Sequence, residues 1–134
     1  MKLIVCLDER RGMMFNHRRQ SRDRVLIENM ERLVGAHTLY VTSYSESLLL
    51  KSKLRYVVAD DPFAVAGEED YCLIESFDPA KQMQAVDVVV LYHWNRHYPA
   101  DLYFTADMKG FTLIETEEFA GSSHEKITRE VWKR

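Results

Sequence analysis

The stretch Lys2-Leu3-Ile4-Val5-Cys6-Leu7, read together with the two segments that follow it, decides the fold of this chain. Its run of apolar residues is typical of a strand covered on both faces. Residues 22–34 then predict a helix, because apolar side chains repeat on one face at Leu26, Ile27, Met30, Leu33 and Val34. Ser21 is a good N-cap for this helix and Gly35 a good C-terminal stop. A strand at Thr38–Thr42 completes a unit that is predicted to be a right-handed parallel crossover.

The rest of the chain predicts further strands with short helices between them. We expect strands at 54–59, 71–75, 86–92, 102–105, 111–119 and 125–132, and short helices at 45–51 and 79–84. The last two strands are adjacent in the chain, which predicts an antiparallel ribbon. The sequence therefore predicts one α/β domain over residues 1–134, with a mixed, mostly parallel sheet, flanking helices and a C-terminal antiparallel ribbon.

The composition is that of an ordinary globular protein. The 134 residues are 46% hydrophobic and carry a formal charge of −3, so a core can form and general nucleic-acid binding is not implied. Cys6 and Cys72 both lie in apolar runs, which predicts two free thiols in a reducing compartment. No apolar run is long enough for a membrane span or for the core of a signal peptide. We therefore expect a cytoplasmic protein with no membrane partner.

Arginine is concentrated in one segment. Between Glu9 and Arg24 the chain has six arginines against one glutamate and one aspartate, a local charge of +4. Guanidinium groups and free backbone N–H groups at a helix N-terminus suit a phosphate or a carboxylate. Arg18, Arg19 and Arg22 are therefore candidates for binding a small anionic or nucleotide-like ligand. A solvated arginine-rich loop is the alternative interpretation.

A second group of functional side chains follows the predicted strand at 86–92, at a strand end where α/β proteins place ligands. His93 and His97 are candidate acid/base residues, and Trp94 and Arg96 are suited to stacking on and contacting a base. The alternative is that Trp94 packs as a lid on the core. The strand-ending carboxylates are candidates for a divalent ion, but acidic residues end strands routinely and we predict no metal site; they are Asp8, Asp60, Asp61 and Asp107.

The order of elements resembles dihydrofolate reductase over nearly the whole chain. The opening, Leu3–Leu7 with Asp8 and Gly12-Met13, resembles the family's first strand and the loop that folds over its active site. Ser21-Arg22-Asp23 resembles the place where the family carries its substrate-binding acid, and Leu102–Thr105 resembles a late strand whose threonine pairs with that acid. Residues 123–134 resemble the terminal strand in spacing. The resemblance implies a dihydrofolate reductase-like fold with Asp23 and Thr105 as catalytic residues.

Asp23 also has an interpretation from the helix pattern alone. It lies on the same stripe as Ile27, Met30 and Val34, which is consistent with a carboxylate that faces a pocket and has a raised pKa. An acid in the first helical turn that complements the helix dipole is the ordinary alternative.

The departures from the reductase pattern concern the cofactor. The family's Gly-Arg-x-Thr turn is replaced by Thr42-Ser43-Tyr44-Ser45, and its Gly-Gly turn after strand five by the bulky Tyr92-His93-Trp94. Asp60 and Asp61 stand where the family holds an adenosine phosphate, and they would repel it. We therefore expect no NADPH binding and predict no cofactor.

The segment Asn16–Arg24 is also similar to small proteins labelled ribonuclease Z. A His-x-His-x-Asp-His cluster, which that enzyme would need, does not occur, and the five histidines are scattered. Three functions remain open: a reductase-like domain that binds a small anionic or nucleotide-like ligand, an RNA-binding or RNA-cleaving protein, and a divergent NADPH-dependent reductase. Whether the chain is an enzyme is left open by the sequence.

Overall fold

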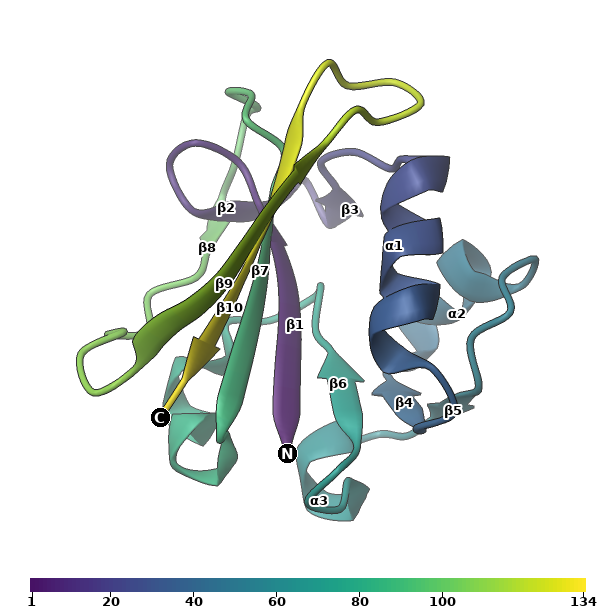
Figure 1. The fold of residues 1–134 in the computed structure, drawn as a ribbon, viewed down its shortest axis with the longest axis vertical. Helices are drawn as coiled ribbons and strands as arrows, with labels where there is room; N and C mark the ends of the chain where they lie inside the picture. Colours follow the sequence, from purple (N-terminus) through teal and green to yellow (C-terminus); the bar gives the residue numbers. More distant parts are fainter.

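A seven-stranded mixed sheet forms the centre of the molecule in the computed structural model, which describes residues 1–134 (Figure 1). The strand order is β5-β4-β6-β1-β7-β10-β9. The first five strands in this order are parallel, whereas β10 is antiparallel to both β7 and β9. The bounds are β1 Lys2–Leu7, β4 Leu39–Val41, β5 Tyr56–Val58, β6 Tyr71–Leu73, β7 Val88–His93, β9 Thr112–Phe119 and β10 Ile127–Lys133. The predicted mostly parallel sheet with a C-terminal antiparallel ribbon is confirmed.

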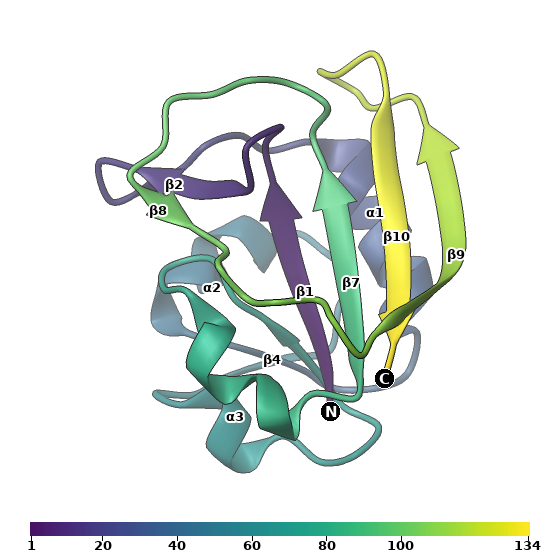
Figure 2. The same cartoon turned by 90° about the vertical axis from the view of Figure 1, so that its left-hand side faces the viewer.

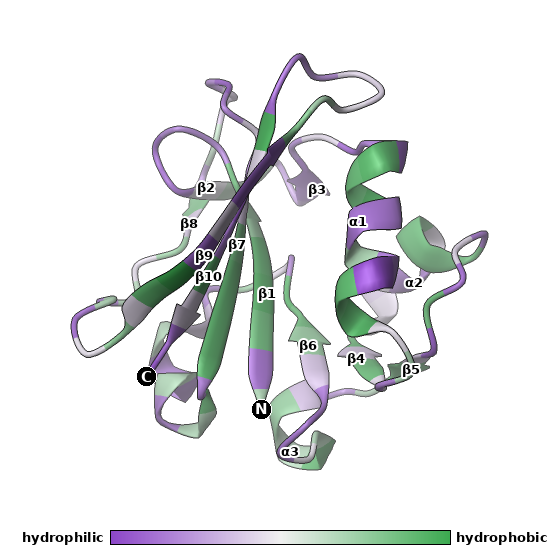
Figure 3. Ribbon diagram, viewed as in Figure 1, coloured by the Kyte–Doolittle hydropathy of each residue, from purple (hydrophilic) through white to green (hydrophobic).

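Strand β1 lies in the middle of this sheet and separates two cores. Leu3, Val5 and Leu7 belong to one apolar cluster, whereas Ile4 belongs to the other. Neighbouring side chains of a strand point to opposite faces, so a strand with both faces covered is apolar at every position. The hydropathy colouring shows the contrast between β1, which is apolar along most of its length, and the more polar β9 (Figure 3). All but one residue of β9 is exposed.

Helix α1, Arg24–Val34, covers one face of the sheet with Leu26, Met30 and Val34. Its N-cap is Asp23 and not Ser21 as predicted, because the Asp23 carboxylate accepts hydrogen bonds from the N–H groups of Val25 and Leu26. The predicted stop at Gly35 is confirmed, with a φ of 57° that favours glycine. Helix α2, Ser43–Leu49, follows β4, and the short helix α3, Pro62–Val65, follows β5 and was not predicted.

The opposite face is covered by a second, three-stranded sheet. Strands β3 Arg18–Arg19, β2 Gly12–Phe15 and β8 Leu102–Tyr103 form it in the order β3-β2-β8. Phe15 pairs with Arg18 across a two-residue turn in which Asn16 and His17 both have positive φ, as a type I′ hairpin requires. The arginine-rich segment is thus a hairpin and not a loop, and Leu102–Tyr103 lies outside the main sheet.

Figure 2 shows how this face is closed. Strands β2 and β8 lie beside the carboxyl end of β1, and the segment between β8 and β9 runs across β1 and β7. This segment contributes the buried side chains of Phe104, Ala106 and Phe111 to the core. The 3-10 helix Pro79–Ala85 adds Met83. No helix of the protein has the length and apolar content that a membrane span requires.

Candidate functional site

The carboxyl ends of β1, β4 and β6 lie beneath the β2–β3 hairpin, and an ion pair fills the space there. Arg19 donates two hydrogen bonds to the Glu75 carboxylate, at 2.9 and 3.0 Å, and its guanidinium lies 4.8 Å from the ring of Tyr44. Ser45 donates a further hydrogen bond to Glu75, at 2.7 Å. Burial alone would lower the pKa of Arg19, but the hydrogen bond and the charge of Glu75 raise it. Arg19 was predicted to bind a ligand, but here it binds a carboxylate of its own chain.

Asp8 follows β1 and fills the neighbouring part of this carboxyl edge of the sheet. Its buried carboxylate accepts hydrogen bonds from the N–H groups of Arg10, Gly12 and Tyr98 and from the side-chain amide of Gln20. Burial alone would raise its pKa, but the hydrogen bonds donated by the backbone lower it. A β-carbon at Gly12 would lie within 3 Å of the side chains of Asp8, Gln20 and Ala100, so this glycine serves close packing of the chain.

Asp23 lies in a buried network with the turn between β9 and β10. Its carboxylate accepts hydrogen bonds from the N–H groups of Ser122 and Ser123 and lies 2.9 Å from Nδ1 of His124. Burial alone would raise its pKa, but the hydrogen bonds from His124, Ser122 and Ser123 outweigh this and hold the pKa far below its usual range. The expectation that Asp23 has a raised pKa is therefore wrong.

The N-terminus of α1 is also not a free anion site. Asp23 takes the N–H groups of Val25 and Leu26, and Arg24 donates its N–H to the hydroxyl of Ser122. The remaining first-turn N–H group, that of Ile27, bonds to the carbonyl of Asp23. The predicted phosphate position at this helix end is thus filled by the chain itself.

The other candidate catalytic residues, Thr105, His93 and His97, form no hydrogen bond with one another or with Asp23. Thr105 donates both its backbone N–H and its hydroxyl to Asp78, and it shares no hydrogen bond with Asp23. Nε2 of His93 lies 2.7 Å from the Glu130 carboxylate on the neighbouring strand β10. His97 is exposed and forms no hydrogen bond or ion pair through its side chain. The expected pairing of Asp23 with Thr105 is wrong, because the short strand that precedes Thr105 belongs to the second sheet.

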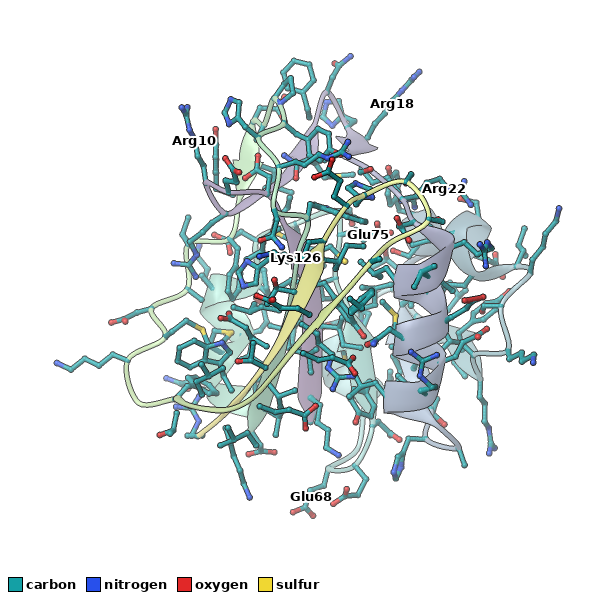
Figure 4. The ribbon with its side chains drawn as sticks, turned by 45° about the horizontal axis from the view of Figure 1, so that its top comes forward. Arg10, Arg18, Arg22, Glu68, Glu75 and Lys126 are labelled. Carbon is teal, nitrogen blue, oxygen red and sulfur yellow. The ribbon has the colours of Figure 1, made fainter.

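The candidate ligand-binding residues divide between core and surface. Trp94 is 4% exposed and stacks on the ring of His124, with centroids 4.7 Å apart. This position supports the alternative of a core side chain and leaves Trp94 unavailable to a base at the surface. Arg96 is exposed and donates to the carbonyl of Ser123. Arg10 and Arg18 extend away from the molecule, whereas Glu75 lies inside it (Figure 4).

Comparison with solved structures identifies the architecture. A dihydrofolate reductase from Enterococcus faecalis, solved in complex with NADP(H) and RAB-propyl, superposes on this chain with a TM-score of 0.71. The match covers 99% of this chain and 95% of the reductase, at 11% sequence identity. The chain has a dihydrofolate reductase-like fold. No sequence-family model matches it, and no curated protein sequence matches it.

A small cavity lies beneath the hairpin, at the carboxyl edge of this reductase-like sheet. The cavity beneath the hairpin has a volume of about 10 Å³, enough for one water molecule, whereas small-molecule sites hold about 300–1,000 Å³. Side chains of Arg19, Glu75 and Trp94 line it, and no glycine provides a close approach to the backbone. The structure also contains no group of three or more His, Cys, Asp or Glu side chains placed to hold a metal ion. The similarity to proteins labelled ribonuclease Z therefore finds no support.

The largest hollow of the reductase-like domain lies elsewhere, along the outer side of α1. This groove has a volume of about 890 Å³ and runs between α1 and the segment after α2. Five cationic side chains line it: Arg22, Arg24, Arg32, Lys51 and Lys53. Three acids also line it, but Asp23 is buried, Glu28 pairs with Arg24, and Glu31 accepts the N–H of Lys53. Four of the five cations have no ion pair, which leaves the groove positively charged.

Several of these residues were not found from the sequence. His124 meets Asp23 across 101 positions, and Glu75 meets Arg19 across 56, so no local pattern signals either contact. The sequence does contain a weak indication of the cationic groove. Arg24, Glu28, Glu31 and Arg32 form the polar side of the helix opposite its apolar stripe, and Lys51-Ser52-Lys53 is a basic turn.

Proposed function

We propose that this reductase-like domain binds a small phosphorylated ligand, such as a mononucleotide, in the groove along α1, and that it does so without NADPH. The observation that carries the proposal is the set of four cations without ion pairs in the largest hollow of the molecule: Arg22, Arg32, Lys51 and Lys53. Phosphate oxygens are the acceptors that such guanidinium and ammonium groups favour. Arg22 is the one predicted ligand-binding residue that lies in this groove.

The test is ADP binding measured by calorimetry at low salt. The double substitution Arg32→Gln/Lys53→Gln is expected to weaken binding at least about tenfold, or about 1.4 kcal/mol. The control Arg10→Gln/Lys109→Gln removes the same charge from exposed positions outside the groove. It is expected to change affinity by less than about twofold. Equal weakening in both doubles, or no ADP binding at millimolar concentration, would overturn the proposal.

RNA is the main alternative ligand, and salt separates it from a mononucleotide. Binding of a short RNA would involve many phosphates, so the logarithm of affinity would fall by roughly 0.7 per phosphate for each unit in the logarithm of salt. A mononucleotide in the groove has few phosphates and is expected to show a slope of no more than about 2. A steep slope for RNA together with no measurable ADP binding would replace our proposal with an RNA-binding function.

A divergent reductase is the remaining alternative, and the closed edge beneath the hairpin disfavours it. NADPH fluorescence is expected to show no saturable enhancement with this protein at micromolar concentrations. Saturable enhancement that survives Arg32→Gln/Lys53→Gln would place the cofactor outside the groove and would favour the reductase.

A further inference from the structure

We propose that Ser21, His124 and Asp23 form a nucleophile–base–acid triad, and that it gives the chain an esterase activity toward small acyl groups. The three residues come from the segment before α1 and from the turn between β9 and β10. The inference does not depend on the groove or on its ligand.

The hydrogen bonds have the connectivity that an activated serine needs. Asp23 Oδ2 lies 2.9 Å from Nδ1 of His124, and the Ser21 hydroxyl lies 3.1 Å from Nε2 of the same ring. A carboxylate can only accept, so the proton of the neutral ring lies on Nδ1. Nε2 is then the lone pair that can take the hydroxyl proton, as in serine hydrolases.

The base and the acid are held firmly. The side chains of His124 and Asp23 are 1% and 0% exposed. Trp94 stacks on the imidazole with an interplanar angle of 26°, and the N–H groups of Ser122 and Ser123 fix the carboxylate. Hydrogen bonding keeps Asp23 ionised, so it can stabilise the imidazolium that forms when His124 takes a proton.

Tyr98 is the one further group at Nε2. Its hydroxyl lies 2.9 Å from Nε2 of His124 and 3.4 Å from Oγ of Ser21. In the resting protein it competes with Ser21 for the imidazole lone pair. When it donates to Ser21 Oγ instead, the serine remains free to donate to His124. Removal of the Tyr98 hydroxyl therefore leaves the serine–histidine bond without a competitor.

Ser21 is partly exposed and borders the cavity of about 10 Å³ beneath the hairpin. Apolar side chains of Met13, Ile74 and Trp94 also line this cavity. Because this cavity is small, we expect Ser21 to react with short acyl groups such as acetyl. The backbone N–H groups of Ser21 and Arg22 donate no hydrogen bond within the chain, which leaves them as candidate donors to a developing oxyanion.

The reaction is ordinary acyl transfer to water. Ser21 Oγ forms a bond to the ester carbonyl carbon, and its proton passes to Nε2 of His124. The bond from the carbonyl carbon to the alcohol oxygen then breaks, and the alcohol leaves with the proton from Nε2. Water adds to the acyl-serine by the same route, which releases the carboxylic acid and restores Ser21.

The test combines turnover of p-nitrophenyl acetate with labelling by a fluorescent fluorophosphonate. Peptide mass spectrometry is expected to place the label on Ser21, and Ser21→Ala is expected to lower the hydrolysis rate at least tenfold without a change in melting temperature. Ser47→Ala removes an exposed serine of α2 and is expected to retain full rate and labelling. The butyrate ester is expected to react at least tenfold more slowly than the acetate.

Two further variants separate an activated serine from a structural one. His124→Gln is expected to abolish labelling of Ser21, and Tyr98→Phe is expected to retain or increase it. The proposal is overturned if Ser21 is unlabelled in the wild type, if Ser21→Ala hydrolyses acetate at the wild-type rate, or if folded His124→Gln labels normally. If His124→Gln does not fold, the proposal is judged by the hydrolysis rate of Ser21→Ala alone.

Discussion

Replacement of Asp23 by asparagine is expected to destabilise the protein far more than an ordinary N-cap substitution. Oδ1 of Asp23 accepts hydrogen bonds from the N–H groups of Val25, Leu26 and Ser122, and asparagine retains this oxygen. Oδ2 accepts from the N–H and the hydroxyl of Ser123 and bonds to Nδ1 of His124. In Asp23→Asn an NH₂ group replaces Oδ2 and faces these three donors.

The magnitude follows from two of the three bonds at Oδ2, because the Ser123 hydroxyl can donate to the carbonyl of Arg22 instead. His124 can move its proton to Nε2 and accept from the new amide, which still loses the charge-assisted bond, at a cost of about 1.5 kcal/mol. The N–H of Ser123 is left without an acceptor, which costs about another 1.5 kcal/mol. We expect a total loss of about 3 kcal/mol in the free energy of unfolding.

Urea denaturation followed by circular dichroism measures this loss. With a slope of about 2 kcal/mol per molar urea, the midpoint is expected to fall by about 1.5 M. The matched control is Asp61→Asn, since Asp61 is the N-cap of α3 and its carboxylate accepts only one hydrogen bond, from the N–H of Phe63. It is expected to lose less than about 0.5 kcal/mol. A loss in Asp23→Asn no larger than that of the control would refute the reasoning.

Three further outcomes follow from other contacts. Because the pKa of Asp23 is depressed in the folded state, its contribution is fully present above about pH 4 and is lost as the pH falls further; acid unfolding of Asp23→Asn should therefore be less steep than that of the wild type. Burial raises the pKa of the Cys72 thiol to about 12, so Cys72 should react with a disulfide reagent at pH 8 only after unfolding, and fast reaction of the folded protein would contradict its burial. Glu75→Gln leaves the half-buried Arg19 without its counter-charge and should cost about 2–3 kcal/mol, whereas Arg19→Met/Glu75→Gln should cost less than the sum of the two single substitutions in the same urea assay.

The main sheet could be predicted because its central strands are marked in the sequence by local runs of apolar residues. A strand buried on both faces is apolar at successive positions, and β1 from Leu3 to Leu7 and β7 from Val88 to Tyr92 follow this pattern. The β2–β3 hairpin was missed because its strands are short and its turn is Asn16-His17 instead of the more familiar Asn-Gly. Both residue types tolerate positive φ, so the signal was present but weak.

The candidate site was predicted less well because its contacts join distant parts of the chain. Asp23 was predicted to have a raised pKa, but its pKa is lowered, because the direction of the shift depends on His124 and the turn before β10. Trp94 was selected for its aromatic ring, and burial rather than ligand binding explains its position. Sequence spacing reports which face of an element a side chain occupies, and it does not report which distant donor meets that side chain.

The central position of β1 has a consequence for synthesis of the protein. Strand β1 leaves the ribosome before its two neighbours, β6 and β7, which begin only at Tyr71 and Val88. At about 5–20 residues per second, both edges of the most apolar strand remain unpaired for on the order of ten seconds. Cotranslational binding of a chaperone to the first seven residues would cover those edges during this interval, and overproduction without such cover would favour aggregation through the same strand.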